Sequence, residues 1–259
     1  MSTTRPLALV TGGCRRVGAA IGVALAKAGY DLAIHSGAES PPDEALGVAI
    51  AEAGVEWARF VADLLDPAAV AALVPAIEAR FGRVPMLLVN NAARFDQDRP
   101  DSATHRGLLD HYAVNTVAPL LLAQAVAARA TADVPAVIVN ILDQRIAAPN
   151  ADQFSYTLSK LALSEATTIL ARDFAPHVRV CAVAPGPTLP TPDYGADRWA
   201  AAARHLPLER MPDPSEIADA VLFLARSGTI TGQTIFVDGG AHLRGYERDF
   251  LYLDGEETT

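Results

Sequence analysis

Short, continuously apolar runs alternate along the chain with longer stretches rich in Ala and Leu. The short runs do not alternate between apolar and polar residues, which is typical of parallel strands that helices cover on both faces. The longer stretches are amphipathic, as helices packed on a sheet are. The expected strands are 6–13, 31–35, 56–62, 85–92, 136–142, 178–186 and 233–240. The expected helices are 15–29, 42–54, 67–82, 104–130, 153–175 and 213–227.

Seven strands separated by helices predict an α/β fold, a single doubly wound Rossmann-type domain with a seven-stranded parallel sheet. No change of composition divides the chain, so residues 1–259 are expected to form one domain. Residues 189–212, with Tyr194, Trp199 and Arg204, are expected to form a lid over a substrate. A C-terminal tail, residues 244–259, follows the last strand.

Composition narrows the classes of function. The 259 residues are 51% hydrophobic and carry a formal net charge of −9, without a Lys- or Arg-rich run. This charge pattern argues against nucleic acid or an anionic membrane as a partner. No apolar run is long enough for a signal peptide core or a membrane span, so a cytoplasmic protein is expected. Cys14 and Cys181 lack CxxC spacing, so neither a disulfide framework nor a metal site is predicted.

A glycine-rich turn follows the first predicted strand. The segment TGGCRRVG, residues 11–18, has the small residues that let a backbone approach a pyrophosphate at the start of a helix. Such a turn alone is a weak signal, but its place after the first strand of a seven-strand α/β chain favours a dinucleotide. Its adjacent cations, Arg15 and Arg16, offer partners for a phosphate.

The end of the second predicted strand bears on which dinucleotide binds. An acidic residue at this tip would bind the ribose 2′-hydroxyl of NAD and repel the extra phosphate of NADP. The strand ends in AIHSGAES without an acid at its tip, so NADP(H) is predicted, although Glu39 lies only a few residues beyond. Ser36 could assist the arginines, and His35 has either this function or a structural one.

Three further strand ends carry polar residues that a cofactor could use. Asp63 could accept a hydrogen bond from an adenine amino group, or serve only as a turn or cap residue. Asn90 opens NNAARF, where the backbone comes close to the expected cofactor. Thr188, in PGPT, could bond the nicotinamide amide or a phosphate, or belong to a plain loop.

The chemistry-bearing residues gather around the fifth predicted strand. Tyr156 and Lys160 are one helical turn apart and share a face, and Asp143 ends the strand before them. A phenol with a pKa of about 10 needs a neighbouring cation to become a good acid–base group near neutral pH. Lys160 and an oxidised nicotinamide are predicted to supply this positive charge. Asn115 is a polar residue that interrupts an apolar helix face.

Together these motifs resemble the short-chain dehydrogenase/reductase family over roughly residues 5–243, through TGGCRRVG, NNA, Asn115, YTLSK and PGPT. The resemblance implies that Tyr156 donates a proton and that Lys160 tunes it and binds the nicotinamide ribose. It implies that Asn115 holds a water of a proton relay. It also implies a homotetramer formed through helices 104–130 and 153–175.

Two departures from the family pattern point to a subgroup. Most members have Ser where this chain has Asp143, and Gly where it has Arg16. Both substitutions are shared with pteridine reductases and the related dihydromonapterin- or dihydrofolate-reducing enzymes, which this chain therefore resembles. Phe95 falls where those enzymes stack a pterin opposite the nicotinamide. Ala93 stands where they commonly have a small polar residue, which is a departure from the subgroup.

The resemblance assigns residues to a cofactor and a substrate. The residues expected to bind NADP(H) are Gly12, Arg15, Arg16, Val17, Gly18, His35, Ser36, Asp63, Leu64, Asn91, Ala92, Tyr156, Lys160, Pro185, Gly186 and Thr188. The residues expected to contact a pterin substrate are Arg16, Phe95, Asp143 and Tyr156. The expected catalytic group is Asp143, Tyr156, Lys160 and Asn115.

The favoured function is therefore NADPH-dependent reduction of a pterin-like heterocycle. Hydride transfer to a C=N carbon requires a proton at the ring nitrogen, which Tyr156 and Asp143, linked through water, could relay. One alternative within the family is an oxidoreductase of another small carbonyl or alcohol. Another alternative is a non-catalytic NADP(H)-binding regulatory protein, against which the intact Tyr156, Lys160 and Asn115 set argues. Asp143 could instead be a helix cap or the ion-pair partner of Arg145.

Overall fold

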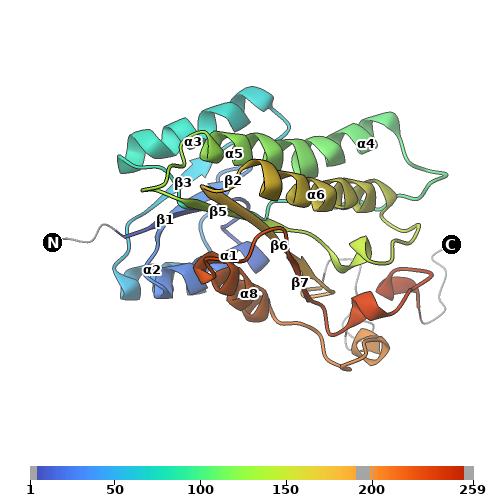
Figure 1. The fold of residues 1–259 in the computed structure, drawn as a ribbon. Helices are drawn as coiled ribbons and strands as arrows, with labels where there is room; N and C mark the ends of the chain where they lie inside the picture. Colours follow the sequence, from blue (N-terminus) through green and yellow to red (C-terminus); the bar gives the residue numbers. More distant parts are fainter. Residues whose placement is uncertain (1–4, 191–198, 200, 254–259) are drawn as a thin grey trace.

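The chain folds around one parallel sheet of seven strands in the order β3-β2-β1-β4-β5-β6-β7 (Figure 1). The computed structural model describes residues 5–190, 199 and 201–253. The strands are β1 Leu7–Val10, β2 Asp31–Ser36, β3 Trp57–Val61, β4 Leu87–Asn90, β5 Ala136–Ile141, β6 Val178–Pro185 and β7 Thr234–Val237. Every predicted strand is confirmed. The strands β1, β2 and β3 follow one another towards one edge of the sheet, and the order then reverses because β4 pairs with the other side of β1.

Helices cover both faces of the sheet, with α1, α2 and α8 on one face and α3, α5 and α6 on the other (Figure 1). The α-helices of the described residues are α1 Arg16–Lys27, α2 Glu44–Ala53, α3 Pro67–Phe81, α4 His105–Tyr112, α5 Ala118–Ala127, α6 Phe154–Asp173 and α8 Pro214–Arg226. Short 3-10 turns lie at η2 Gln144–Ile146, η3 Ala203–His205, η4 Ala241–Leu243 and η5 Phe250–Tyr252.

Local sequence signals set where several helices begin and end. Asp213 caps α8 in a capping box with Glu216, and Pro214 occupies the first helical position. Asp66 caps α3 by accepting from Ala68, and Gly82 ends this helix in the left-handed conformation with φ 67°. These caps explain why the predicted helix bounds agree with the structure to within a few residues.

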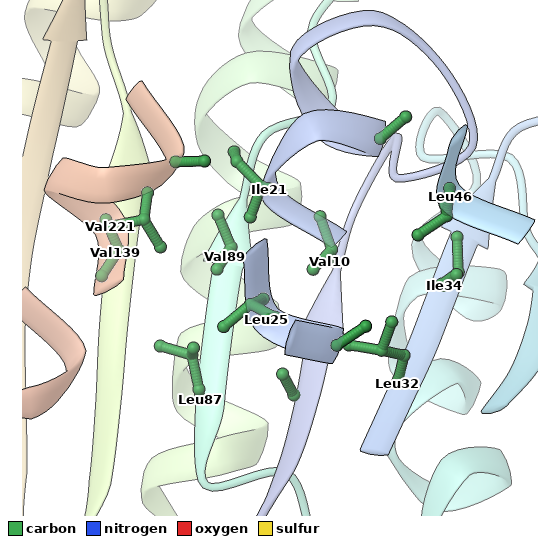
Figure 2. Close-up of a cluster of buried hydrophobic side chains, with 14 of the residues drawn as sticks. Val10, Ile21, Leu25, Leu32, Ile34, Leu46, Leu87, Val89, Val139 and Val221 are labelled. Carbon is green, nitrogen blue, oxygen red and sulfur yellow. The ribbon is translucent and has the colours of Figure 1, made fainter. Parts of the chain in front are cut away.

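Two apolar clusters, one on each face of the sheet, form the core. Successive residues of β1 alternate between them, because Leu7 and Leu9 join one cluster while Ala8 and Val10 join the other. Figure 2 shows the cluster under α1, where Ile21 and Leu25 pack on the strands. The strands are thus fixed on both sides, which makes their carboxyl ends a rigid platform for a site.

The predicted helix 104–130 is interrupted. It consists of α4, a π-helical turn η1 at Ala113–Val117, and α5. A π-turn inserts an extra residue into the helical hydrogen-bond ladder and is frequent at functional sites. Here the wider turn contains Asn115.

Candidate active site

The carboxyl ends of the strands open into a cavity of about 910 Å³. The predicted site residues that line it are Gly12, Arg15, Arg16, Val17, Gly18, His35, Asp63, Leu64, Asn91, Ala92, Phe95, Asp143, Tyr156, Lys160, Pro185, Gly186 and Thr188. A cavity beyond the carboxyl ends of parallel strands, beside the point where the strand order reverses, is the usual ligand site of this architecture. The sheet thus brings together residues that are far apart in sequence.

The glycine turn brings β1 and α1 into close contact. Gly12 has φ +60°, and a Cβ at Gly18 would lie 2.2 Å from the Gly12 carbonyl oxygen, so the turn needs glycine at both positions. Helix α1 starts immediately afterwards, with no acidic residue in its first turn, and Arg15 and Arg16 are exposed at the cavity. A pyrophosphate requires a backbone turn that it can approach closely, the start of a helix and cations, and all three lie here, so this end of the cavity fits a dinucleotide.

Arg16 has a positive φ of 55°, which is rare for a residue with a side chain. Its guanidinium donates to the carbonyl oxygens of Leu189 (3.2 Å) and Pro190 (3.1 Å). Its backbone N–H donates to Asp43 Oδ2 at 3.2 Å. Arg16 therefore connects the glycine turn to the first residues of the predicted lid.

His35 joins three strand ends and also lines the cavity. Its Nε2 lies 2.9 Å from the Ala62 carbonyl oxygen, and the Gly12 N–H donates to its Nδ1 at 3.3 Å. Burial lowers the pKa of His35, although the bond to Ala62 opposes this shift. The neutral ring with its proton on Nε2 satisfies both contacts, so the structural function expected as one alternative is present.

Two polar residues, one at the end of β2 and one beyond it, have partners away from the cavity. Ser36 donates to the Ala38 carbonyl oxygen at 2.8 Å and is not among the described residues that line the cavity, so its cofactor contact stays a prediction. The side chain turns into a tight loop and is buried there. Glu39 pairs with Arg59, so its carboxylate already has a cation as a partner.

The three remaining strand ends hold their polar groups in local hydrogen bonds. Asp63 accepts from the Leu65 N–H at 2.9 Å, and the Thr188 hydroxyl donates to the Gly186 carbonyl at 2.8 Å. Asn91 donates to the Thr11 carbonyl at 2.9 Å. All three residues line the cavity. Asp63 and Thr188 therefore have the local hydrogen bonds of a turn, and their contacts with a cofactor stay predictions.

Tyr156, Asp143 and Lys160 meet at one end of the cavity. The Tyr156 hydroxyl donates directly to Asp143 Oδ2 at 3.1 Å, where the sequence suggested a link through water. Asp143 Oδ1 accepts from the Arg145 N–H at 2.9 Å and caps η2. Lys160 donates to the Ile141 carbonyl at 2.6 Å, and its Nζ lies 5.6 Å from the centre of the Tyr156 ring. Asp143 is thus both a cap and a partner of the tyrosine.

Burial controls the protonation of this group. Burial raises the pKa of Tyr156 well above its ordinary value, the Asp143 carboxylate raises it further, and the Arg145 guanidinium opposes both. Burial also lowers the pKa of Lys160 to about 8. In the protein alone, burial therefore outweighs the opposing effect of the Arg145 guanidinium on the tyrosine pKa. The lowering of this pKa by Lys160 together with an oxidised nicotinamide stays a prediction for the complex with the cofactor.

Asn115 lies beneath the site rather than in it. Its side chain accepts from the Arg94 N–H at 2.8 Å, donates to the Arg94 carbonyl at 2.9 Å and donates to Ser159 Oγ at 2.9 Å. Among the described residues that line the cavity, its neighbour Val114 appears and Asn115 does not. The Asn115 side chain therefore fixes the backbone of Arg94, next to Phe95. This structural function is additional to the predicted one of holding a water, which stays a prediction.

Phe95 forms an aromatic wall beside the group predicted to be catalytic. Its ring is half-exposed and meets the Tyr156 ring edge-on, with centroids 4.8 Å apart and an interplanar angle of 76°. The Arg145 guanidinium lies 5.8 Å from its centre. A flat aromatic or conjugated ligand could stack on such a face.

The C-terminal tail contributes residues that sequence reasoning did not assign to the site. Arg145 and Asp249 form an ion pair, both are buried, and both line the cavity with Phe250. Phe250 packs in an apolar cluster with Ala202 of its own chain. No local motif marks Asp249, because its partner Arg145 is distant in sequence.

Trp199 of the predicted lid lines the cavity, whereas Tyr194 lies outside the described residues. Within the described part of the chain, no group of three or more His, Cys, Asp or Glu side chains is placed to hold a metal ion. No helix in the same part of the chain has the length and apolar character needed to cross a membrane.

Comparison with known proteins gives consistent similarities over nearly the whole chain. A profile of the family described as enoyl-(acyl carrier protein) reductase matches residues 13–242. The 3-oxoacyl-[acyl-carrier-protein] reductase FabG of Staphylococcus epidermidis is 30% identical, with 91% of this chain and 98% of that protein covered.

Two similar solved structures are complexes with NADP. The FolM alternative dihydrofolate reductase 1 of Brucella canis is 38% identical, with a TM-score of 0.85 and coverage of 94% of this chain and 96% of that chain. The FolM alternative dihydrofolate reductase 1 of Brucella suis is 37% identical, with a TM-score of 0.82 and coverage of 95% and 98%.

Proposed function

Because the chain belongs to the short-chain dehydrogenase/reductase family, we propose that it catalyses the NADPH-dependent reduction of a pterin-like heterocycle. The reaction is the reduction of a C=N bond in a dihydropterin or dihydrofolate. The observation that carries this proposal is the direct hydrogen bond between Tyr156 and Asp143.

NADP(H) is the cofactor, as in the two FolM structures. When bound, its nicotinamide supplies the hydride. The start of α1 and Arg15 would hold its phosphates, and Lys160 would hold the nicotinamide ribose. The pairing of Glu39 with Arg59 supports NADP over NAD, because that carboxylate is neutralised instead of facing a 2′-phosphate.

The Tyr156–Asp143 pair suits proton delivery to a ring nitrogen. Hydride addition to the carbon of a C=N bond leaves the nitrogen in need of a proton. Tyr156 carries its proton at neutral pH, because burial keeps its pKa high. Asp143 lies within hydrogen-bond distance and lines the cavity, so it would take up a proton from solvent water and pass it to the tyrosinate that remains after proton delivery.

The same pair argues against a simple carbonyl substrate. Reduction of a ketone develops negative charge on oxygen, which a neighbouring carboxylate repels unless it is protonated. The similarity to FabG of Staphylococcus epidermidis nevertheless makes a small carbonyl compound the second candidate. A regulatory protein that only binds NADP(H) is the third, and the intact Tyr156 and Lys160 argue against it.

Phe95 supports a planar substrate. Its ring plane makes an angle of 76° with the Tyr156 ring, so a flat ligand stacked on Phe95 would present its edge to the phenol. Arg16, tied to the start of the predicted lid, would contact the substrate and the cofactor phosphates. Phe95 and Arg16 would thus position the ring system of a pterin.

A homotetramer is the proposed assembly. Large apolar side chains are exposed on α4 and α6, and Leu109 and Ile169 are 53% and 64% accessible. Neighbouring exposed side chains on the same helical layer are Tyr112, Val117 and Leu158. An apolar face of this kind gains free energy when a second copy covers it.

Substitution of Asp143 by Ser tests the proposed chemistry. Asp143→Ser should reduce kcat for dihydropterin reduction at least about tenfold while a ketone suffers less or gains, because Ser can bind a ketone oxygen. Steady-state NADPH oxidation on both substrate classes measures this ratio. Tyr156→Phe is the control and should remove most turnover on either class with NADPH binding intact. Equal losses on both classes for Asp143→Ser would show that the Asp is only a structural cap.

A further inference from the structure

We infer that Asp249, in the C-terminal tail, is a positioning residue that holds the Arg145 guanidinium and so leaves Asp143 available to Tyr156. The inference uses the proposed function only in taking the Tyr156–Asp143 pair as the proton-delivering group. Asp249 acts through Arg145 and is not assigned a contact with substrate.

Arg145 and Asp143 are held next to each other by the backbone. The Arg145 N–H donates to Asp143 Oδ1 at 2.9 Å, so both side chains leave the same short turn, η2. Arg145 is a buried cation, and a buried guanidinium requires a carboxylate partner. The carboxylate nearest to Arg145 in sequence is Asp143. If Arg145 formed an ion pair with Asp143, the Tyr156 hydroxyl would lose its hydrogen-bond acceptor.

Asp249 supplies a second carboxylate, which competes with Asp143 for the Arg145 guanidinium. It pairs with Arg145, and the two side chains retain only 7% (Arg145) and 2% (Asp249) of their accessible surface. The guanidinium then lies over the Phe95 ring, 5.8 Å from its centre. With Arg145 held there, Asp143 Oδ2 accepts from the Tyr156 hydroxyl.

The tail that carries Asp249 is fastened beside the catalytic helix. The Asp249 N–H donates to Asp152 Oδ2 at 2.8 Å, and Arg248 donates to the same oxygen at 2.9 Å. Arg99 pairs with the other Asp152 oxygen. Asp152 lies two residues before α6, the helix of Tyr156, so the tail links the two segments that form the catalytic pair.

The test is a double-mutant cycle between Asp249 and Arg145. Asp249→Asn keeps the shape of the side chain and removes its charge, so Arg145 should turn to Asp143. We expect kcat to fall at least about tenfold with the KM for NADPH unchanged, because only the catalytic pair is disturbed. Arg145→Gln in the Asp249→Asn background removes the competitor and should restore kcat to within about threefold of Arg145→Gln alone.

Asp31→Asn is the matched control. Asp31 is also buried and also pairs with an arginine, Arg83, but at the amino-terminal end of β2, away from the cavity. It should lower the melting temperature to a similar extent as Asp249→Asn and leave kcat unchanged. Loss of kcat in both variants, in proportion to lost stability, would overturn the inference.

A crystal structure of the Asp249→Asn variant separates this inference from the proposed substrate. The expected structure has Arg145 paired with Asp143 and no hydrogen bond between Asp143 and Tyr156. An intact Tyr156–Asp143 bond would overturn the inference, as would a double variant no faster than Asp249→Asn. If the protein reduces carbonyl compounds but no pterin, the proposed function is wrong, and the double-mutant cycle is then measured with the carbonyl substrate. If the protein turns over none of these substrates, the pairing of Arg145 in the crystal structure of the Asp249→Asn variant tests the inference.

Discussion

Asp143 has two functions that the sequence presented as alternatives. One carboxylate oxygen caps η2 and the other accepts from Tyr156. Residue types and spacing can indicate that an Asp at a strand end is a cap or a catalytic partner, but they do not say that its two oxygens face different groups. Its direct contact with the phenol, in place of a bridging water, likewise depends on the rotamer that the surrounding turn imposes.

The protonation of Tyr156 was the least predictable property of the site. The spacing to Lys160 correctly places the two side chains near each other, with the ammonium 5.6 Å from the ring centre. The direction of the pKa shift depends instead on solvation, and only 7% of Tyr156 is exposed. Burial arises from segments distant in sequence, so a four-residue motif cannot reveal it.

Arg16 gives a prediction that separates stability from activity. It adopts φ 55°, which costs a residue with a side chain about 1 kcal/mol or more and costs glycine little. Arg16→Gly should therefore keep the melting temperature or raise it, although added freedom of the unfolded chain offsets part of the gain. The same change should lower kcat/KM at least about tenfold, because one charge-assisted contact is lost. Thermal unfolding and NADPH oxidation measure the two effects.

Glu209→Gly is the matched control for that prediction. Glu209 also has a positive φ, 50°, but it is exposed and is not among the described residues that line the cavity. It should show the same kind of stability change with unaltered kcat/KM. A loss of stability for Arg16→Gly without loss of activity would mean that the contacts of Arg16 to Leu189 and Pro190 serve only the fold.

At the scale of elements, the strands and caps were predictable and the interruptions were not. Continuous apolar runs correctly place all seven strands, because burial on both faces removes polar residues from them. The π-turn at Ala113–Val117 has no such signal, since one inserted residue leaves the apolar pattern of helix 104–130 almost unchanged.

The tail shows the same limit. The sequence defines a tail after the last strand but not which surface the tail covers. The structure places Phe250 against Ala202 and Leu206 of the same chain and Asp249 against Arg145. Contacts between residues about a hundred positions apart are set by the whole fold and leave no local pattern.

The exposed face of α6 leads to a prediction about assembly. Ile169→Glu should convert the proposed tetramer to smaller species, because burying a charge in an apolar interface costs several kcal/mol. Sedimentation velocity measures the result. Val48→Glu, on α2 with 50% exposure, is the control and should leave the assembly unchanged. An unchanged tetramer with Ile169→Glu would place the interface on another face.

At the scale of the whole molecule, the sheet order brings the site residues together. Segments that follow β1, β4, β5 and β6 meet at one edge, so Gly12, Asn91, Asp143 and Gly186 all reach the same cavity. The doubly wound fold was predictable from the alternation of strands and helices, and with it the place of the cavity. The substrate depends on a few side chains at one end of that cavity, among them the Arg145–Asp249 pair that sequence reasoning missed.

NADPH oxidation by the purified protein tests whether its substrate is a pterin. Dihydrobiopterin, dihydromonapterin and dihydrofolate are compared with a set of aldehydes and ketones under the same conditions. We expect turnover of at least one dihydropterin or dihydrofolate, with kcat/KM at least about tenfold above that for any carbonyl compound. Turnover of carbonyl compounds alone would contradict it and leave Asp143 as a cap in an ordinary carbonyl reductase.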